Sequence, residues 1–141
     1  MRIMQWIRTR YLLRAIIHQF RYLLNYFLLN SRLFLKNSII YPGVKVFSIK
    51  NITINKHVVI RENCYLYAFK DGFIKIGEDV FIGMFCVIDG TGGVTIGNKV
   101  AISYHTSIIS ASHKYGDIEM PPGEQGSDAK GIKIEDNVWI G

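Results

Sequence analysis

The chain has 141 residues, of which 49% are hydrophobic, and a formal net charge of +6. This length suits one domain with a modest core, and this hydrophobic content excludes a disordered chain. Seven of the 17 basic residues and none of the 11 acidic ones lie in residues 1–36. The other ten basic residues are balanced by acids, so we expect no nucleic-acid partner for the main domain.

Residues 1–36 form a basic leader that is predicted to be an amphipathic helix. Arg10, Arg14, His18, Arg21 and Asn25 recur every three or four residues and would form one polar stripe. No apolar run approaches the roughly 18 residues needed to span a bilayer, and no small-residue cleavage site marks a signal peptide. Two roles remain open: peripheral contact with the inner membrane face, or a cap on the first coil of the following domain.

Four gapless segments define an internal repeat in residues 37–141. The first, third, seventh and ninth positions of every segment are Ile or Val. The segments are ITINKHVVI from residue 52, IKIGEDVFI from 74, VTIGNKVAI from 94 and IKIEDNVWI from 132. Such periodicity indicates a stacked repeat architecture.

Aliphatic residues also recur every six positions, as in Ile76, Ile82 and Ile88. A period of six matches neither an α-helix nor a plain strand. It fits a short strand plus a turn, with one inward side chain per strand and three hexads per triangular coil. The segments start 22, 20 and 38 residues apart, so we expect small corner insertions and one loop excursion over about residues 111–131.

The two cysteines test this register. Cys64, Cys86 and Thr106 each lie ten residues after the third position of a segment. They should therefore stack on consecutive coils, about 4.8 Å apart. That spacing allows a disulfide, but small buried side chains that fill a narrow inward position are the favoured interpretation.

His113 ends the regular repeat, and strand alternation predicts that it points outward. The stretch VAISYHTSIISASHKYGD, a polar excursion and then IKIEDNVWIG resemble the active-site region of the hexapeptide-repeat O-acetyltransferases. The resemblance covers roughly residues 40–141. It implies a mainly β fold, the left-handed parallel β-helix, with acetyl-CoA as co-substrate and a sugar hydroxyl of a cell-surface or capsular glycan precursor as acceptor. It also implies that His113 is the general base.

The same resemblance assigns two further residues. Asp89 matches an acidic position that contacts the acceptor sugar, although a plain corner-turn role is equally consistent with its sequence context. Trp139 matches a tryptophan of the active-site wall and is outward by alternation. Relatives are homotrimers with active sites between neighbouring subunits. Asp117 or Glu119 would orient the imidazole, and the sequence does not choose between them.

Other features limit this interpretation. His57 and His105 fall at corners and are read as surface residues, so no metal is expected. Family members continue past D-N-V-W-I-G with coils that line the CoA groove, whereas this sequence stops at Gly141. We therefore expect a C-terminally truncated chain, with most of the CoA groove missing after Gly141 and the CoA-binding residues unassigned.

A cytoplasmic location is expected. The alternative function is a non-catalytic β-helix scaffold, or an inactive remnant, held at the membrane by the leader.

Overall fold

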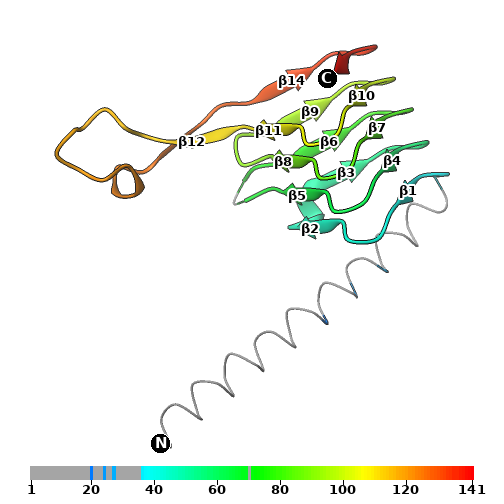
Figure 1. The fold of residues 1–141 in the computed structure, drawn as a ribbon, viewed down its shortest axis with the longest axis horizontal. Coiled ribbons are helices and arrows are strands. Elements are labelled where there is room, and N and C mark those ends of the chain that lie inside the picture. Colours follow the sequence, from blue (N-terminus) through cyan, green and yellow to red (C-terminus); the bar gives the residue numbers. More distant parts are fainter. Residues whose placement is uncertain (1–19, 21–23, 25–26, 28–35, 70) are drawn as a thin grey trace, which may run out of the picture.

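The computed structural model describes residues 20, 24, 27, 36–69 and 71–141, and these are mainly β. Residues 39–69, 71–110 and 132–140 form a parallel β-solenoid with three sheets (Figure 1). The first sheet contains β1 Ile39–Ile40, β4 Val59–Ile60, β7 Phe81–Ile82, β10 Ala101–Ile102 and β15 Trp139–Ile140. The second contains β2 Lys45–Phe47, β5 Tyr65–Tyr67, β8 Val87–Asp89 and β11 Ser107–Ile109. The third contains β3 Ile52–Ile54, β6 Ile74–Ile76, β9 Val94–Ile96 and β14 Ile132–Ile134.

Each coil contributes one strand to each sheet in turn, and the strands stack in the register predicted from the repeat. In the first sheet Ile60 pairs with Ile82, and Ile102 pairs with both Ile82 and Ile140. The third sheet pairs equivalent positions of the four repeat segments in the same way. The six-residue aliphatic ladder is therefore confirmed as the inward face of a parallel solenoid.

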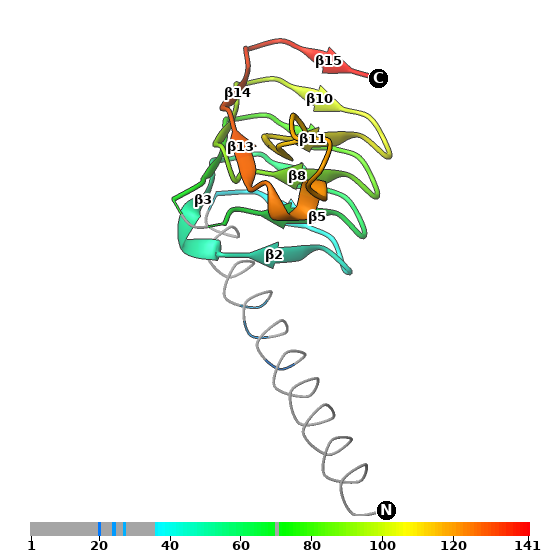
Figure 2. The ribbon, with the colours of Figure 1, turned by 90° about the vertical axis from the view of Figure 1, so that its left-hand side faces the viewer.

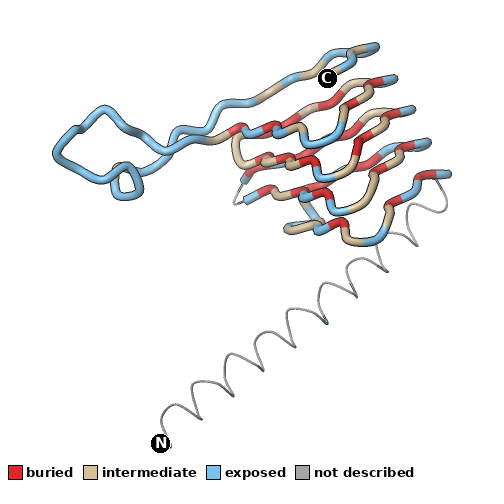
Figure 3. The backbone as a smooth tube through the Cα atoms, viewed as in Figure 1, coloured by how far each residue is buried: buried red, intermediate tan, exposed pale blue. Residues whose placement is uncertain are grey.

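The core is a narrow column of aliphatic side chains along the solenoid axis. The buried residues, red in Figure 3, recur at corresponding places on successive coils. The largest side chains that are almost fully buried are Ile60, Leu66, Ile74, Ile76, Ile82, Ile88, Ile96 and Ile102. A two- or three-residue strand can bury only one or two side chains. The core is therefore continuous only because successive coils lie on one another.

Hydrogen bonds at one corner column explain the polar pairs between the aliphatic positions. Oδ1 of Asp136 accepts the backbone N–H of Asn98 at 2.7 Å, and Oδ1 of Asn98 accepts the N–H of Glu78 at 2.9 Å. Each side chain thus satisfies a donor on the coil below. Next to this column, His57, Asp79 and Lys99 adopt positive φ angles of 58°, 56° and 55°, a conformation that lets the chain turn sharply.

Between β11 and β14 the chain leaves the solenoid as a projecting arm, residues 111–131 (Figures 1 and 2). Strands β12 Ala111–His113 and β13 Ser127–Ala129 pair antiparallel and form its stem. A short 3₁₀ helix, η2 Pro122–Glu124, lies near its tip. A second 3₁₀ helix, η1 Ile49–Asn51, connects β2 to β3. The predicted excursion is thus an ordered hairpin with polar, mostly exposed strands.

Both cysteines are buried and free, which confirms the space-filling interpretation. Cys64 is 1% exposed and Cys86 is fully buried. Their Sγ atoms donate to the carbonyl oxygens of Gly83 and Ser103, at 2.9 and 3.0 Å. They stack as predicted, because the N–H of Tyr65 bonds to the Cys86 carbonyl on the next coil at 2.8 Å. The disulfide alternative is absent from the structure.

The amphipathic helix predicted for residues 1–36 lies outside the described residues, apart from residues 20, 24, 27 and 36. Phe20, Leu24 and Phe27 have exposed side chains. Among the residues that the structure describes, no helix has the length and apolar character to cross a bilayer.

Truncation of one ladder residue should test the core. Ile82 is fully buried in the middle strand of the first sheet. We expect Ile82→Ala to lower the free energy of unfolding by about 2–5 kcal/mol, because the substitution removes buried methyl groups and leaves a cavity. Urea denaturation measures this loss. Ser107→Ala, at an exposed outward position of β11, is the control and should change stability by less than about 0.5 kcal/mol. Equal effects would contradict the assigned core.

The buried thiol predicts an alkaline loss of stability. Burial raises the pKa of the Cys64 thiol from its usual value of 9.0 to about 11. The folded state therefore holds this proton more tightly than the unfolded chain. The contribution of the protonated thiol to the free energy of unfolding is complete below pH 9 and is lost as the pH rises towards 11. Its size is about 2–3 kcal/mol.

Comparison of the wild type with Cys64→Ala isolates this contribution. Other groups that titrate in the same alkaline range are common to both proteins, so only the difference in their unfolding free energies is informative. That difference should shrink or reverse as the pH rises. A constant difference over this range would contradict a buried, neutral thiol.

Candidate functional site

The corner between the second and third sheets carries the base of the arm, and Ser110 fixes it there. Ser110 follows β11 directly and is 4% exposed. Its Oγ donates to the carbonyl oxygen of Asp89 at 2.6 Å and accepts the N–H of Gly92 at 2.8 Å. Its own carbonyl accepts the N–H of Lys130 at 2.9 Å. One buried residue thus joins the outgoing strand, the returning strand and the coil below.

Glycines allow the backbones to approach one another at this corner. A Cβ atom on Gly92 would overlap the carbonyl oxygen of Ser110, and one on Gly93 would lie 2.7 Å from the ring of Phe73. Gly93 also has a φ of +91°, a conformation that other residues rarely adopt. Gly92 and Gly93, the last two residues of the sequence GTGG after Asp89, are therefore required by the close packing beneath the arm.

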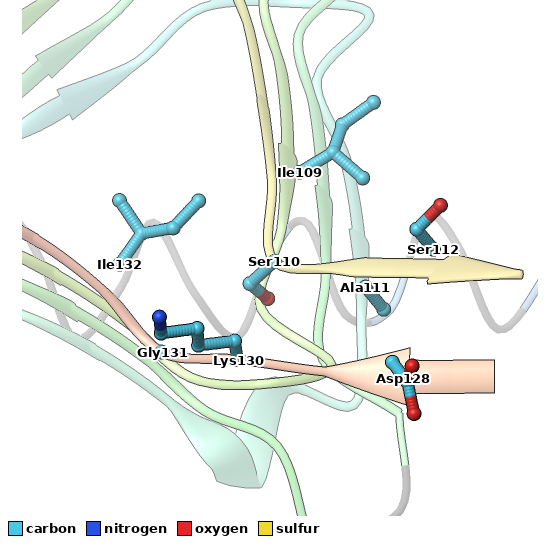
Figure 4. A pocket seen from close by; sticks show the side chains of 8 residues that line it. All are labelled: Ile109, Ser110, Ala111, Ser112, Asp128, Lys130, Gly131 and Ile132. Atoms are coloured by element: carbon cyan, nitrogen blue, oxygen red, sulfur yellow. The ribbon is translucent and has the colours of Figure 1, made fainter. Parts of the chain in front are cut away.

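An open hollow of about 340 Å³ lies at the arm base and is lined by residues of both the outgoing and the returning segment (Figure 4). Its lining combines apolar and polar groups, as small-molecule sites commonly do. The residues that line it are Ile109, Ser110, Ala111, Ser112, Asp128, Lys130, Gly131 and Ile132. Lys130 and Asp128 supply one cationic and one anionic group.

Asp89 ends β8 directly beneath this hollow, because its Cα pairs with that of Ile109. Its Oδ1 accepts the N–H of Thr91 at 2.8 Å, which is an Asx turn. Within the described residues its Oδ2 has no hydrogen-bond partner, and the residue is half-buried. Asp89 therefore fills the corner-turn role and also keeps one acceptor oxygen available at the surface.

His113 lies on β12 and pairs with Ser127 of β13. The side chain is exposed, as predicted. His113 lies on the projecting arm, inside the excursion predicted for about residues 111–131, so the regular repeat ends before His113 and not at it. The chain leaves the solenoid at Ser110, where the backbone bonds to Lys130 and stops following the coil below.

The arm tip is organised by Gln125. Its Nε2 donates to the carbonyl oxygens of Asp117 and Met120, at 2.7 and 2.6 Å, and its Oε1 accepts the N–H of Asp117 at 3.0 Å. The Asp117 carboxylate accepts the N–H of Glu119 at 3.0 Å. The Asp117 carboxylate is thus part of the tip's own turn. Near it, Tyr115 and Ile118 are 80% and 93% exposed, which gives the tip an apolar surface.

Trp139 is 75% exposed on β15, so its predicted outward direction is confirmed. Its strand pairs with β10 in the first sheet, whereas the arm leaves from β11 of the second sheet (Figure 2). Within one chain the structure brings Asp89 to the arm base that precedes His113, but places Trp139 on another face.

Gly141 directly follows β15 and is exposed. A Cβ atom there would lie 3.0 Å from Cη2 of the Trp139 ring, so the glycine leaves room for the indole. The expectation that most of the CoA groove lies after Gly141 stays a prediction, and no CoA-binding residue is assigned among the described residues.

The remaining histidines of the solenoid belong to corners. His57 Nδ1 lies 3.1 Å from Oδ1 of Asp79, and the ring of His105 stacks on that of Phe85 with centroids 5.1 Å apart. The described part of the chain holds no group of three or more His, Cys, Asp or Glu side chains arranged to bind a metal ion.

Comparison with known proteins adds no family assignment: no protein-family model matches the sequence, and no solved structure matches it significantly. The fold defines the class of protein as a parallel β-solenoid with a projecting β-hairpin arm.

Sequence reasoning missed Ser110 and the two charged residues of the hollow, Asp128 and Lys130. Ser110 stands where an aliphatic ladder becomes a polar stretch, so it reads as the first residue of a loop. The only sequence signal is its position after Ile108 and Ile109, where the next inward group of the coil is expected.

Loss of the Ser110 hydroxyl should loosen the arm. Ser110→Ala leaves the N–H of Gly92 without its partner, so we expect the unfolding free energy to fall by about 1–3 kcal/mol. Limited proteolysis should also cut residues 111–131 faster. Ser112→Ala, two residues along and exposed, is the matched control and should leave both measurements unchanged. Identical behaviour of the two variants would show that Ser110 does not hold the arm.

Proposed function

We propose that this protein is an acetyl-CoA-dependent O-acetyltransferase that acetylates a sugar hydroxyl of a cell-surface or capsular glycan precursor. One observation carries the proposal: an exposed histidine follows the buried anchor of an arm, and an acidic residue with an available oxygen lies at that anchor. The similarity of residues 100–117 and 132–141 to hexapeptide-repeat O-acetyltransferases supports the same assignment.

In the proposed reaction His113 is the general base. A neutral imidazole nitrogen takes the proton of the acceptor hydroxyl while that oxygen attacks the thioester carbonyl carbon of acetyl-CoA. The C–O bond forms, the tetrahedral intermediate collapses, and the C–S bond breaks. The thiolate of CoA leaves and takes the proton from the imidazolium, which regenerates the base. An exposed histidine on an arm suits a role that requires access to two substrates.

Asp89 is proposed to bind the acceptor. Its Oδ1 is held by the Thr91 N–H, so the carboxylate has a fixed orientation. The other oxygen can then accept a hydrogen bond from a sugar hydroxyl, and such charge-assisted bonds are stronger than neutral ones. Its position at the base of the arm that carries His113 supports this role.

The proposed assembly is a homotrimer of left-handed β-helices at the inner face of the cytoplasmic membrane. Trp139 and the arm lie on different faces of one chain, so a neighbouring copy would have to bring its Trp139 to the arm. The exposed Tyr115 and Ile118 at the arm tip are consistent with such a contact. Residues 1–36 would provide peripheral membrane contact.

Substitution of His113 tests the proposal. Purified full-length protein is incubated with acetyl-CoA and a panel of free sugars, and release of the CoA thiol is followed. We expect His113→Ala to reduce kcat at least about 100-fold, in keeping with the usual contribution of general-base catalysis. His105→Asn is the matched control, because it changes another surface histidine at a corner that Asn tolerates. It should retain wild-type activity.

The non-catalytic scaffold is the alternative outcome. If neither the wild type nor His113→Ala releases thiol with any sugar, the enzymatic assignment fails for this chain. If both release thiol at the same rate, the chemistry does not depend on His113. The proposal requires a clear difference between the two.

A further inference from the structure

A strip of aromatic side chains lies on the outer face of the second sheet at β2 and β5 and continues two residues past the end of β5. Its members are Phe47, Tyr65, Tyr67 and Phe69. The ring centroids of Phe47 lie 5.0 Å from Tyr65 and 6.4 Å from Tyr67, and those of Tyr67 and Phe69 are 5.9 Å apart at 10°. Tyr65 and Phe69 are 38% and 48% exposed. The rings thus pack against one another, and part of their surface remains accessible to solvent.

The strip is continuous with the candidate acceptor site. Tyr67 pairs with Asp89 on the next coil, and Asp89 pairs with Ile109, which lines the hollow. Tyr67 also pairs with Phe47, which lies on the coil below. The positions from Phe47 to Ile109 thus form one outward column over four coils. At a coil spacing of about 4.8 Å the column extends roughly 14 Å from the arm base.

The side chains of the aromatic strip and of this column together favour a glycan as the ligand. Aromatic rings offer flat apolar faces on which the C–H faces of pyranose rings can pack, and the tyrosine hydroxyls add polar contacts at the edges. The available oxygen of Asp89 accepts hydroxyl hydrogen bonds. The third sheet, by contrast, presents the exposed lysines Lys75 and Lys133 at the middle positions of β6 and β14.

We infer that the aromatic strip is a glycan-binding subsite that extends the acceptor site down the solenoid, so that the acceptor is an oligosaccharide of at least about three units, the length that spans the column. The inference rests on the proposed function for the position of the reacting sugar, but glycan binding itself does not require catalysis. Units beyond the acetylated sugar would lie on Tyr67 and then on Phe47, the next two positions down the column.

Glycan binding by the full-length protein tests this inference. The probes are immobilised neutral and acidic glycans of increasing length, each series including its monosaccharide. We expect at least one oligosaccharide to bind at least about 10-fold more tightly than its monosaccharide, a difference of about 1.4 kcal/mol. Tyr67→Ala should abolish that preference. Tyr67→Leu keeps a large apolar side chain, so it separates the loss of the aromatic ring from a loss of folding, and it should weaken the preference by about the same factor. Tyr104→Ala, an exposed tyrosine outside the strip, is the matched control and should bind as the wild type does.

Several results would overturn the inference: no chain-length preference in any series, equal binding by Tyr67→Leu and the wild type, or a change of oligomeric state in Tyr67→Leu without any glycan binding. The last result would identify the strip as a contact between copies of the chain. Failure of the proposed function is separable, because glycan binding without His113-dependent thiol release leaves the inference intact. Acetylation that is independent of chain length overturns the inference and leaves the function.

Discussion

The structure depends on the stacking of very short parallel strands around a thin aliphatic column. Two or three residues per strand cannot form a stable sheet or bury a core alone. Each coil therefore needs the coil below it, both for its backbone hydrogen bonds and to cover inward residues such as Ile82 and Ile88. This constraint makes the six-residue ladder strict, and it leaves outward positions and corners free to vary. The arm, the aromatic strip and Asp89 all occupy such positions.

The solenoid could be predicted from the sequence because stacking requires an inward aliphatic residue at about every sixth position. Inward positions admit only side chains of a narrow size range, so the pairing of Ile60 with Ile82 and the stacking of Cys64 on Cys86 followed from counting residues. The free state of both thiols also agrees with the filling of a narrow interior. Handedness is a property of the turns and not of the spacing, so the repeat could not supply it.

The arm could not be predicted to the same extent. Both strands of its stem are polar and mostly exposed, so they carry no alternation of apolar and polar residues that would indicate a hairpin. The outward direction of His113 followed from alternation, but its place on the arm depends on Ser110, Gly92 and Lys130 meeting at one corner. Such contacts between distant residues have no local sequence signature. Trp139 shows the same limit, since counting gave its direction but not its distance from His113.

Cross-linking of outward positions on the second sheet tests the stacked solenoid most directly. Val87 and Ser107 pair on adjacent coils, so their Cα atoms should be about 4.8 Å apart, within the range of a disulfide. Tyr65 and Ser107 are two coils apart, at about 10 Å, which is too far. The account predicts that Val87→Cys/Ser107→Cys forms an intramolecular disulfide under mild oxidation and that Tyr65→Cys/Ser107→Cys does not. Efficient bridging of the second pair, or of neither, would contradict the solenoid.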